Sequence, residues 1–412
     1  MPVSGPLCQT RKAWLSLCLL VAVLTSACTA GSPGTGPAAS QVSLSPGAPG
    51  SRISGWLHTS GQVILDSRNR PVRLLGVSVQ GMGKGQGLPS GNSQGIKGYS
   101  IPSGGTYPNI SSWGFNSIRL PIAWADIEPT PPTVASDGSV THHYNEPYLS
   151  AVDGIVHAFG QRGIAVILCM CQHKWSPSMQ FKDAKGDPVP ASGMPTWLYP
   201  PSTYNHVYQA KRDFFANVNH TWDWFTEAWK KVAARYADNP TVVGVDVLNE
   251  PYWGTSYLPS PDLLHLDELY KQVGTGIRSV NPHVLLIFED SQDNGSGTFG
   301  LHGPPPFPNV VYSFHLYTDN WQPEGLTRTQ DYMARATQWH LPLWIGEFNR
   351  FGKATGKSAP PDWTQQLAQM LTYTRGHDIS WAYWGYNGTD PLADPSDQLA
   401  NPELLRLLQA GF

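Results

Sequence analysis

Short apolar runs alternate with longer amphipathic segments along most of the chain. The runs are nearly continuous in Val, Ile and Leu, which is typical of parallel strands that are buried on both faces. We therefore predict eight parallel strands. They cover residues 72–79, 117–124, 164–171, 242–248, 284–288, 310–316, 343–348 and 379–384.

Helical patterning fills the intervals between these strands. The predicted helices cover residues 148–162, 222–237, 263–280, 327–338, 363–375 and, at the end, 402–409. Strand and helix alternating eight times predicts the α/β class and a (β/α)8 TIM barrel, with a small N-terminal β-hairpin around the polar turn at 66–69. A doubly wound open sheet is the alternative. It would need a phosphate or dinucleotide loop, and the glycines of 81–87 fit neither spacing.

The N-terminal segment has the pattern of an export signal. Arg11 and Lys12 precede an apolar run at 13–24, and small residues follow it. The run is too short for a comfortable transmembrane helix. Cys28 stands where a bacterial lipoprotein is cleaved and lipidated, so we expect either secretion or attachment to the outer cell surface through Cys28.

A segment rich in Gly, Ser and Pro follows the signal and has almost nothing to bury, which is typical of a flexible linker. The predicted organisation is a signal peptide at 1–28, a linker at 29–51 and one catalytic domain at 52–412. We expect the domain to be a monomer.

Composition excludes some functions and restricts others. The net charge of −3 and the absence of a basic stripe argue against a nucleic-acid partner. Only Cys169 and Cys171 lie in the domain, and two cysteines one residue apart on a strand cannot bridge without strain. Together with His173 they could form a metal site. Tetrahedral zinc usually draws on paired loops, so we expect the cysteines to fill the interior instead.

Two predicted strands end in a glutamate, which is unusual for a buried strand. Glu250 follows the run at 242–248, and Glu347 closes the run at 343–348. A buried carboxylate costs several kcal/mol unless it is paired, and function in barrels of this kind lies at the carboxyl ends of the strands. Paired carboxylates at one rim are the catalytic groups of glycosidases. Other predicted strands carry polar or aromatic residues at or near the same end, namely Arg119, Gln172, His173, Asn249, His315, Tyr317, Trp384 and Asn387.

Five motifs give the chain a family resemblance. They are Gly-Phe-Asn-Ser-Ile-Arg-Leu-Pro at 114–121, Leu-Asn-Glu-Pro at 248–251, His-Leu-Tyr at 315–317, Ile-Gly-Glu-Phe at 345–348 and Trp-Ala-Tyr-Trp at 381–384. The motifs follow one another in the order of glycoside hydrolase family 5, and the chain resembles this cellulase family, in the clan of (β/α)8 retaining glycosidases. The resemblance covers roughly Gly55 to Phe412.

The resemblance implies a role for each matched residue. Glu250 would be the general acid/base and Glu347 the nucleophile. The other implied roles are a bond from Asn249 to the sugar 2-hydroxyl, a positive charge from Arg119 beside the nucleophile, a polar floor from His315 and Tyr317, with Tyr317 bonding the nucleophile, and a stacking platform from Trp384. None of them calls for a metal or an organic cofactor, because the carboxylates carry out the proton transfer and the covalent chemistry.

The resemblance is incomplete at the third strand. The family commonly carries Asp-x-His there, whereas this chain has Cys169-Met-Cys171-Gln-His173, with Cys171 in the place of the histidine. His173 lies two residues further on and on the same face of a regular strand. We expect His173 to bind substrate in place of the family's histidine, from a position slightly nearer the end of the strand.

The predicted activity is retaining hydrolysis of O-glycosidic bonds in a carbohydrate substrate of the β-glucan or β-mannan type, by double displacement. The two carboxyl groups should then stand about 5–5.5 Å apart, against about 6.5–9.5 Å for inversion. One alternative is cleavage of glycolipids, as in endoglycoceramidases. Another is a non-catalytic carbohydrate-binding barrel, which would need a lost carboxylate.

The insertion after the third strand has three possible roles. It is long and rich in aromatic residues, and long loops are uncommon unless they are functional. The aromatic side chains could stack on sugar rings, form an apolar lip for a lipid, or pack the loop. They are Trp175, Trp197, Tyr199, Tyr204 and Tyr208.

Overall fold

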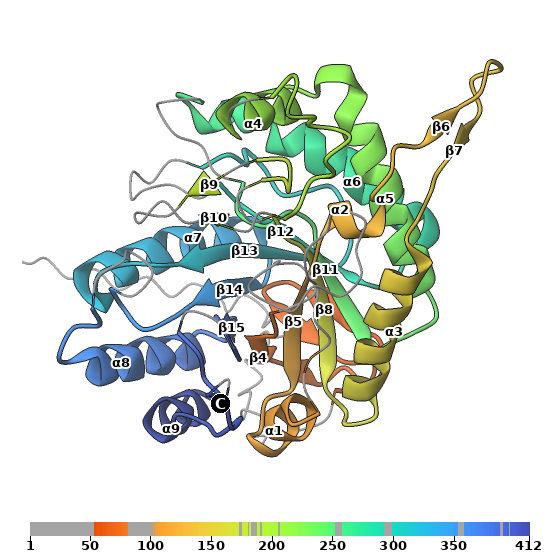
Figure 1. Cartoon of the computed structure of the whole chain (residues 1–412). Helices are drawn as coiled ribbons and strands as arrows, with labels where there is room; N and C mark the ends of the chain where they lie inside the picture. Colours follow the sequence, from red (N-terminus) through yellow and green to blue (C-terminus); the bar gives the residue numbers. More distant parts are fainter. Residues whose placement is uncertain are drawn as a thin grey trace, which may run out of the picture. The chain divides into compact units, whose positions relative to one another are not determined.

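Eight parallel strands close into a barrel in the computed structural model (Figure 1). They are β4 (Leu75–Ser78), β5 (Ser117–Ile122), β8 (Ala165–Met170), β11 (Val242–Asp246), β12 (Leu285–Glu289), β13 (Val310–Leu316), β14 (Leu343–Phe348) and β15 (Ser380–Tyr383). The barrel closes where β15 pairs with β4, with Trp381 opposite Leu75. The predicted TIM barrel is therefore confirmed.

The structure describes most of the barrel domain. The described residues are 53–80, 102, 104–172, 175–179, 181–182, 188–189, 192–204, 207–251, 258–291, 299–352, 358–387, 390–394 and 396–412, and they belong to one compact unit, Ser45–Phe412. The predicted signal, the linker, Cys28 and His173 lie outside the described residues.

Helices surround the barrel (Figure 1). They are α1 (Thr106–Ser112), α2 (Trp124–Ile127), α3 (Glu146–Gly160), α4 (Val207–Phe215), α5 (Thr221–Arg235), α6 (Leu266–Val280), α7 (Leu326–Trp339), α8 (Trp363–Gly376) and α9 (Pro402–Ala410), with short turns η1 (Val218–His220), η2 (Pro261–Leu264) and η3 (Trp321–Gly325). Side-chain caps explain where α3 and α9 begin, because Asn145 and Asn401 each accept a hydrogen bond from a backbone N–H of the first turn. Within the described part of the chain, no helix is both long and apolar enough to cross a membrane.

The N-terminal hairpin is present and gains a third strand. β1 (His58–Ser60), β2 (Val63–Leu65) and β3 (Pro71–Val72) form an antiparallel sheet. The prediction of one strand over 72–79 was therefore wrong, because Val72 pairs in this sheet and the barrel strand begins at Leu75. The strand predicted at 117–124 likewise ends at Ile122, since Trp124 begins α2.

The loops contain short antiparallel pairs of strands. β6 (Thr133–Val134) and β7 (Val140–Thr141) form a hairpin that stands away from the barrel (Figure 1), and β9 (Phe181–Lys182) pairs with β10 (Pro188–Val189).

Side-chain alternation divides the core into two layers. Val166 and Leu168 of β8 join the large cluster between strands and helices, whereas Ala165 and Ile167 join the apolar cluster inside the barrel. Further along β8, the same inward face carries Cys169, which meets Arg119 of β5. Apolar side chains thus fill the lower barrel, and polar ones follow toward the carboxyl ends of the strands.

Candidate active site

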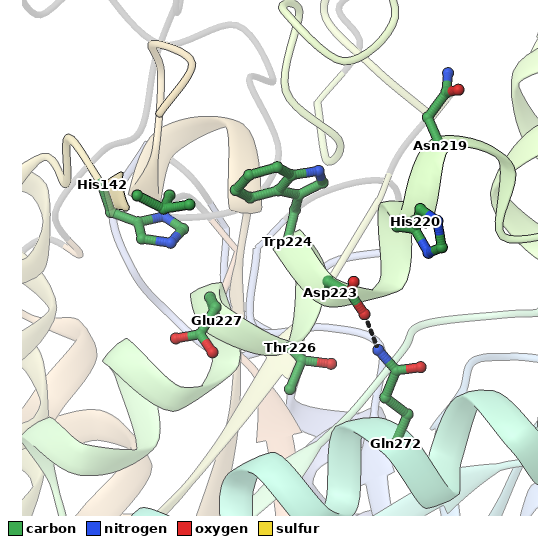
Figure 2. Close-up of a pocket in the computed structure, with 9 residues that line it drawn as sticks. His142, Asn219, His220, Asp223, Trp224, Thr226, Glu227 and Gln272 are labelled. Carbon is green, nitrogen blue, oxygen red and sulfur yellow. Dashed lines mark hydrogen bonds between the residues drawn. The ribbon is translucent and has the colours of Figure 1, made fainter. Parts of the chain in front are cut away.

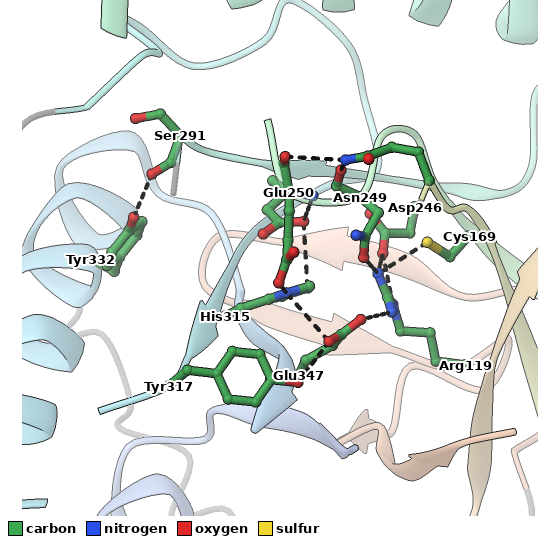
Figure 3. Close-up of polar contacts among 12 residues, drawn as sticks. Arg119, Cys169, Asp246, Asn249, Glu250, Ser291, His315, Tyr317, Tyr332 and Glu347 are labelled. Atoms are coloured by element: carbon green, nitrogen blue, oxygen red, sulfur yellow. Dashed lines mark hydrogen bonds and ion pairs between the residues drawn. The ribbon is translucent and has the colours of Figure 1, made fainter. Parts of the chain in front are cut away.

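A buried polar cluster occupies the carboxyl end of the barrel (Figure 3). It is formed by buried side chains from five of the eight barrel strands, namely Arg119 of β5, Cys169 of β8, Asp246 of β11, His315 of β13 and Glu347 of β14. These residues lie far apart in sequence and meet only because the strands close into a barrel.

Glu347 is held by two donors. Its Oε1 is bonded and ion-paired to Nη1 of Arg119, and its Oε2 accepts a 2.7 Å hydrogen bond from the hydroxyl of Tyr317. Burial, together with nearby carboxylates, raises the pKa of Tyr317 well above its usual value, so the phenol stays a donor. The carboxylate therefore faces a cation on one side and a hydroxyl on the other.

Arg119 is the centre of this network. Its Nε donates to Asp246 Oδ2 at 2.8 Å, and its Nη2 donates to Asn249 Oδ1 at 2.8 Å. Nη2 also contacts Cys169 Sγ at 3.0 Å. Burial alone would lower the pKa of Arg119, but the acidic groups around it outweigh burial and raise that pKa well above its usual value.

The position of Arg119 differs from the sequence prediction. We expected it near the end of the second strand, whereas it is the third residue of β5 and is fully buried. Its guanidinium reaches Glu347 from below the rim, which explains why it can bind four residues at once. Asn249 is held through its amide oxygen, and among the described residues its amide nitrogen has no hydrogen-bond partner.

Glu250 lies on the loop after β11 and is more accessible than Glu347. Its side chain is 35% exposed, and its Oε1 lies 2.9 Å from Nδ1 of His315. Its backbone has φ +47°, in the left-handed region, and its N–H donates to Glu289 Oε2 at 2.8 Å. The exposed side of this carboxyl can reach a bound substrate.

The two carboxylates stand close together. One oxygen of Glu250, one oxygen of Glu347 and a ring nitrogen of His315 all lie within 4.8 Å of one another. This spacing lies on the short side of the two known ranges, near the about 5–5.5 Å of retaining glycosidases and below the about 6.5–9.5 Å of inverting ones. Of the described residues, this trio is also the one His, Cys, Asp and Glu cluster whose atoms could hold a metal ion. Each carboxylate oxygen of Glu347 already accepts a hydrogen bond, one from Arg119 and one from Tyr317.

His315 lies between three carboxylates and is fully buried. Nδ1 faces Glu250 and lies 3.7 Å from Glu347 Oε2, and Nε2 lies 3.4 Å from Glu289 Oε2. Burial opposes the charged ring, but Glu289, Glu347 and Glu250 outweigh it and raise the pKa of His315 to about 9. The ring therefore keeps its proton into the alkaline range.

A bulge places this histidine opposite the glutamate. In the β13–β14 ladder Phe314 pairs with Ile345, and the next pair is His315 with Glu347, so Gly346 is skipped. A Cβ on Gly346 would lie 3.0 Å from Nε2 of His315. Glycine is needed at this position because the imidazole packs directly on the backbone.

Three buried residues in or beside the cluster were not predicted as site residues from the sequence. Cys169 was assigned to interior filling, which its burial confirms, but its contact with Arg119 was not foreseen. Asp246 is an acid inside an apolar run. Glu289 ends β12, and the signal that identified Glu250 and Glu347, a glutamate at the tip of an apolar run, could have identified it too.

The predicted stacking residue Trp384 follows β15. Its side chain is 6% exposed, and its backbone N–H donates to Phe348 at 2.7 Å, which ties it to the strand of Glu347.

The aromatic insertion packs largely on itself. Trp175 and Tyr199 are buried, and the ring of Trp175 contacts Phe214 and Phe215 at centroid distances of 5.3 and 6.0 Å. Tyr208 is 38% exposed. Of the three predicted roles, loop packing is the one that Trp175 and Tyr199 fulfil.

An open hollow of about 660 Å³ lies away from the polar cluster (Figure 2). It lies at the start of α5, and its walls include Trp224, Asp223 and Gln272. Asp223 is bonded to Gln272 at 2.6 Å, and no residue of the polar cluster lines the hollow. The hollow is therefore separate from the candidate active site.

Comparison with known proteins gives results consistent with this geometry. Residues 72–390 match the family model described as cellulase, glycosyl hydrolase family 5. An endoglucanase of Paenibacillus polymyxa is 25% identical over 372 residues, covering 81% of this chain and 80% of its own. An endoglycoceramidase of Hydra vulgaris is 26% identical over 263 residues, covering 55% of this chain and 48% of its own, so the chain spans about half of that relative.

A solved structure shares the fold. The crystal structure of an endogalactoceramidase superposes with a TM-score of 0.69 at 23% identity, covering 86% of this chain and 84% of the other. At this level of identity the likeness concerns the fold.

Proposed function

The chain belongs to glycosyl hydrolase family 5 and is a glycoside hydrolase, and on that premise we propose that it is a retaining β-glycosidase with Glu347 as nucleophile and Glu250 as general acid/base. The observation that carries the proposal is that one oxygen of Glu250 and one oxygen of Glu347 lie within 4.8 Å of each other. This spacing favours the retaining arrangement, with carboxyl groups about 5–5.5 Å apart, over the about 6.5–9.5 Å that leaves room for the attacking water of an inverting enzyme.

The geometry supports a two-step reaction. In the first step a Glu347 oxygen attacks the anomeric carbon, the glycosidic bond breaks with its electron pair on the leaving oxygen, and that oxygen takes the proton of Glu250. In the second step Glu250 removes a proton from water, and the water oxygen displaces Glu347 from the anomeric carbon. The sugar is released with its original configuration, and Glu250 is protonated again.

The surrounding residues have matching tasks in this proposal. Arg119 and Tyr317 hold Glu347 as an anion aimed into the site. Asn249 is fixed through its amide oxygen, which leaves the amide nitrogen for a sugar hydroxyl. Trp384 would lie beneath the sugar, and His173 is proposed to contact it from the third strand.

We propose a β-glucan-type polysaccharide as the first substrate class. The support is the endoglucanase relative, since that match extends over most of both chains. The second candidate is a glycolipid, supported by endoglycoceramidase relatives that match about half of this chain and by the fold shared with an endogalactoceramidase. A carbohydrate-binding barrel without catalysis has less support, because both carboxylates are present.

One experiment tests the activity and the substrate together. The purified protein is incubated with carboxymethylcellulose, mixed-linkage glucan, mannan and a ganglioside, and the first-formed anomer is followed by NMR. Cleavage with retention is expected, and Glu347→Gln should abolish it while the circular dichroism spectrum stays unchanged. An inverted first product, or wild-type rates from Glu347→Gln, contradicts the proposal. Sugar binding without any cleavage would favour the non-catalytic barrel.

We further propose that the enzyme works outside the cell as a monomer, tethered through a lipid on Cys28 or secreted. The signal and linker patterns in the sequence support this location. Cell fractionation of wild type and Cys28→Ala tests it. Release of the variant from the membrane fraction is expected for a tether, and equal distribution of both proteins contradicts it.

A further inference from the structure

Glu289 touches both the acid/base and the histidine behind it. Its Oε2 accepts a 2.8 Å hydrogen bond from the backbone N–H of Glu250 and lies 3.4 Å from Nε2 of His315. The side chain is fully buried, so it does not contact a substrate in the cleft. Its own backbone carbonyl accepts a 2.6 Å hydrogen bond from Tyr270 of α6, which anchors the end of β12.

The bond to Glu250 supports an uncommon backbone conformation. Glu250 has φ +47°, a region that residues with a side chain seldom adopt, and such conformations persist where the surroundings hold them. The carboxylate of Glu289 accepts a hydrogen bond from the N–H of this residue, and Gln172 Nε2 donates to the carbonyl of Asn249, in the same peptide group, at 3.0 Å. The direction of the Glu250 side chain therefore depends on Glu289.

The contact with His315 sets where the ring carries its protons. A carboxylate beside Nε2 favours a proton on that nitrogen. Nδ1 then shares a second proton with Oε1 of Glu250, 2.9 Å away. This shared proton belongs to the pair. Burial raises the pKa of Glu289 to about 8, so its negative charge holds the proton there at alkaline pH.

We propose that Glu289 is a positioning residue of this site, which holds the Glu250 backbone and the His315 ring so that the catalytic proton stays available to the leaving group. The inference rests on the proposed function. Charged and titratable groups from neighbouring elements surround Glu289, His315 and their partners, namely Arg119, Cys169, Asp246, Glu250, Tyr270, Tyr317 and Glu347. The Glu289 carboxylate itself contacts the backbone N–H of Glu250 and the ring of His315.

Leaving groups of different acidity separate this role from a structural one. A phenyl glycoside needs the proton of Glu250, whereas a 2,4-dinitrophenyl glycoside leaves without it. With both aryl β-glycosides of the sugar that wild type accepts, Glu289→Gln should lower kcat/KM on the phenyl substrate about 10- to 100-fold and on the dinitrophenyl substrate less than about 3-fold. kcat/KM is the readout because it reports the first step, whereas kcat also includes the second step, in which Glu250 acts as base.

The pH profile provides a second readout. At alkaline pH, where Glu289 carries its charge, the Gln variant lacks that charge and holds the shared proton more weakly. The alkaline limb of kcat on the phenyl substrate should therefore move down by about 1 pH unit in Glu289→Gln. Glu289→Asp keeps the charge and withdraws the oxygen from both contacts. It should lose rate on the phenyl substrate while its alkaline limb stays at the wild-type position.

Asp290→Asn is the matched control. Asp290 is the next residue, is also buried, and accepts hydrogen bonds from Tyr312 and from backbone N–H groups of Ser291 and Gly300, none of them in the catalytic cluster. This variant should melt at a lower temperature with an unchanged leaving-group dependence and pH profile.

Each outcome decides a different question. Equal losses on both substrates in a folded Glu289→Gln, or wild-type behaviour of it, overturn the inference and leave the proposed function standing. If Glu289→Gln does not fold, a wild-type leaving-group dependence in Glu289→Asp overturns it. A wild-type enzyme that cleaves no aryl β-glycoside and no polysaccharide or glycolipid overturns the proposed function, and the inference with it.

Discussion

The guanidinium of Arg119 is bonded to the carboxylate of Glu347 although the two residues are 228 positions apart in the chain. One lies in β5 and the other in β14, strands that do not pair with each other. The contact crosses the interior of the barrel, and both partners are buried, so it forms only when all eight strands are closed. It couples the stability of the fold to the charge of the proposed nucleophile.

Replacing Arg119 by Met should therefore affect stability and activity together. Removing one partner of a buried ion pair leaves the other uncompensated and costs about 3–5 kcal/mol. We expect the free energy of unfolding in urea to fall by that amount and kcat to fall at least about 100-fold. The control is Arg235→Met, because Arg235 pairs with Glu146 and Asp153 near the surface. It should cost no more than about 1 kcal/mol. Equal losses in both variants would contradict the role of Arg119.

Tyr317→Phe should reduce activity without much loss of stability. The variant removes one hydrogen bond to Glu347 Oε2 and little packing. We expect kcat/KM to fall about 10- to 100-fold in steady-state assays. Tyr312→Phe, which removes a buried bond to Asp290 away from the cluster, should lower the melting temperature and keep kcat/KM. An active Tyr317→Phe would show that Arg119 alone suffices to hold the nucleophile.

Gly346→Ala should displace the imidazole of His315. The new Cβ would lie 3.0 Å from Nε2, so the ring has to move by a few tenths of an ångström. Because the ring contacts Glu250, we expect kcat to fall about 10-fold with a small change in KM. The matched substitution is Gly154→Ala in α3, where a Cβ meets no atom within 4 Å. It should stabilise the protein by about 0.5–1 kcal/mol and leave the kinetics unchanged.

Asp126 should make the protein less stable as the pH rises. Burial raises the pKa of this carboxyl to about 8 from an ordinary value of 3.8, and among the described residues its Oδ1 has no hydrogen-bond partner. Between these two values the unfolded chain has released the proton and the folded chain still holds it. Stability must therefore fall with increasing pH across that window.

Asp126→Asn removes this group and should flatten the dependence. Melting temperatures of wild type and variant are measured from pH 4 to pH 8. The melting temperature of the variant should rise relative to that of wild type as the pH increases. A gap that stays constant over the whole range would show that Asp126 does not titrate in this way.

Trp175→Ala tests the role of the insertion. The ring is buried against Phe214 and Phe215, so truncation should cost about 3–5 kcal/mol in the free energy of unfolding. KM measured on the folded fraction should stay near the wild-type value. Tyr208→Ala, at an exposed position, should cost less than about 1 kcal/mol. A large rise in KM for Trp175→Ala with little loss of stability would instead assign the ring to substrate binding.

The extent of the fold was predictable from the sequence because its signals are local. Buried parallel strands read as apolar runs, and each of the eight predicted runs overlaps one barrel strand. The errors fell at the ends, at Val72 and Trp124, where a residue with strand character pairs in a different sheet or begins a helix. Helix α4 was missed because it lies inside the aromatic insertion and its ring contacts are tertiary.

The candidate carboxylates were also predictable, and their surroundings were not. Glu250 and Glu347 are conspicuous because burying a glutamate at the tip of an apolar strand costs free energy unless the carboxylate is paired. Which groups meet them depends on depth and register. Arg119 lies lower than expected, and the bulge at Gly346 alone brings His315 opposite Glu347.

The sequence by itself determined the strands, their order and the two glutamates at one rim, because each of these follows from patterns within a few residues or from the rule that barrel strands share one carboxyl end. Only the tertiary structure decided that Glu289 lies behind Glu250 and His315, that Arg119 bridges β5 and β14, and that the insertion buries its rings. Those features depend on closure and register between distant segments. A one-residue change of register turns a side chain from one face of a strand to the other, and no local pattern records which register the barrel adopts.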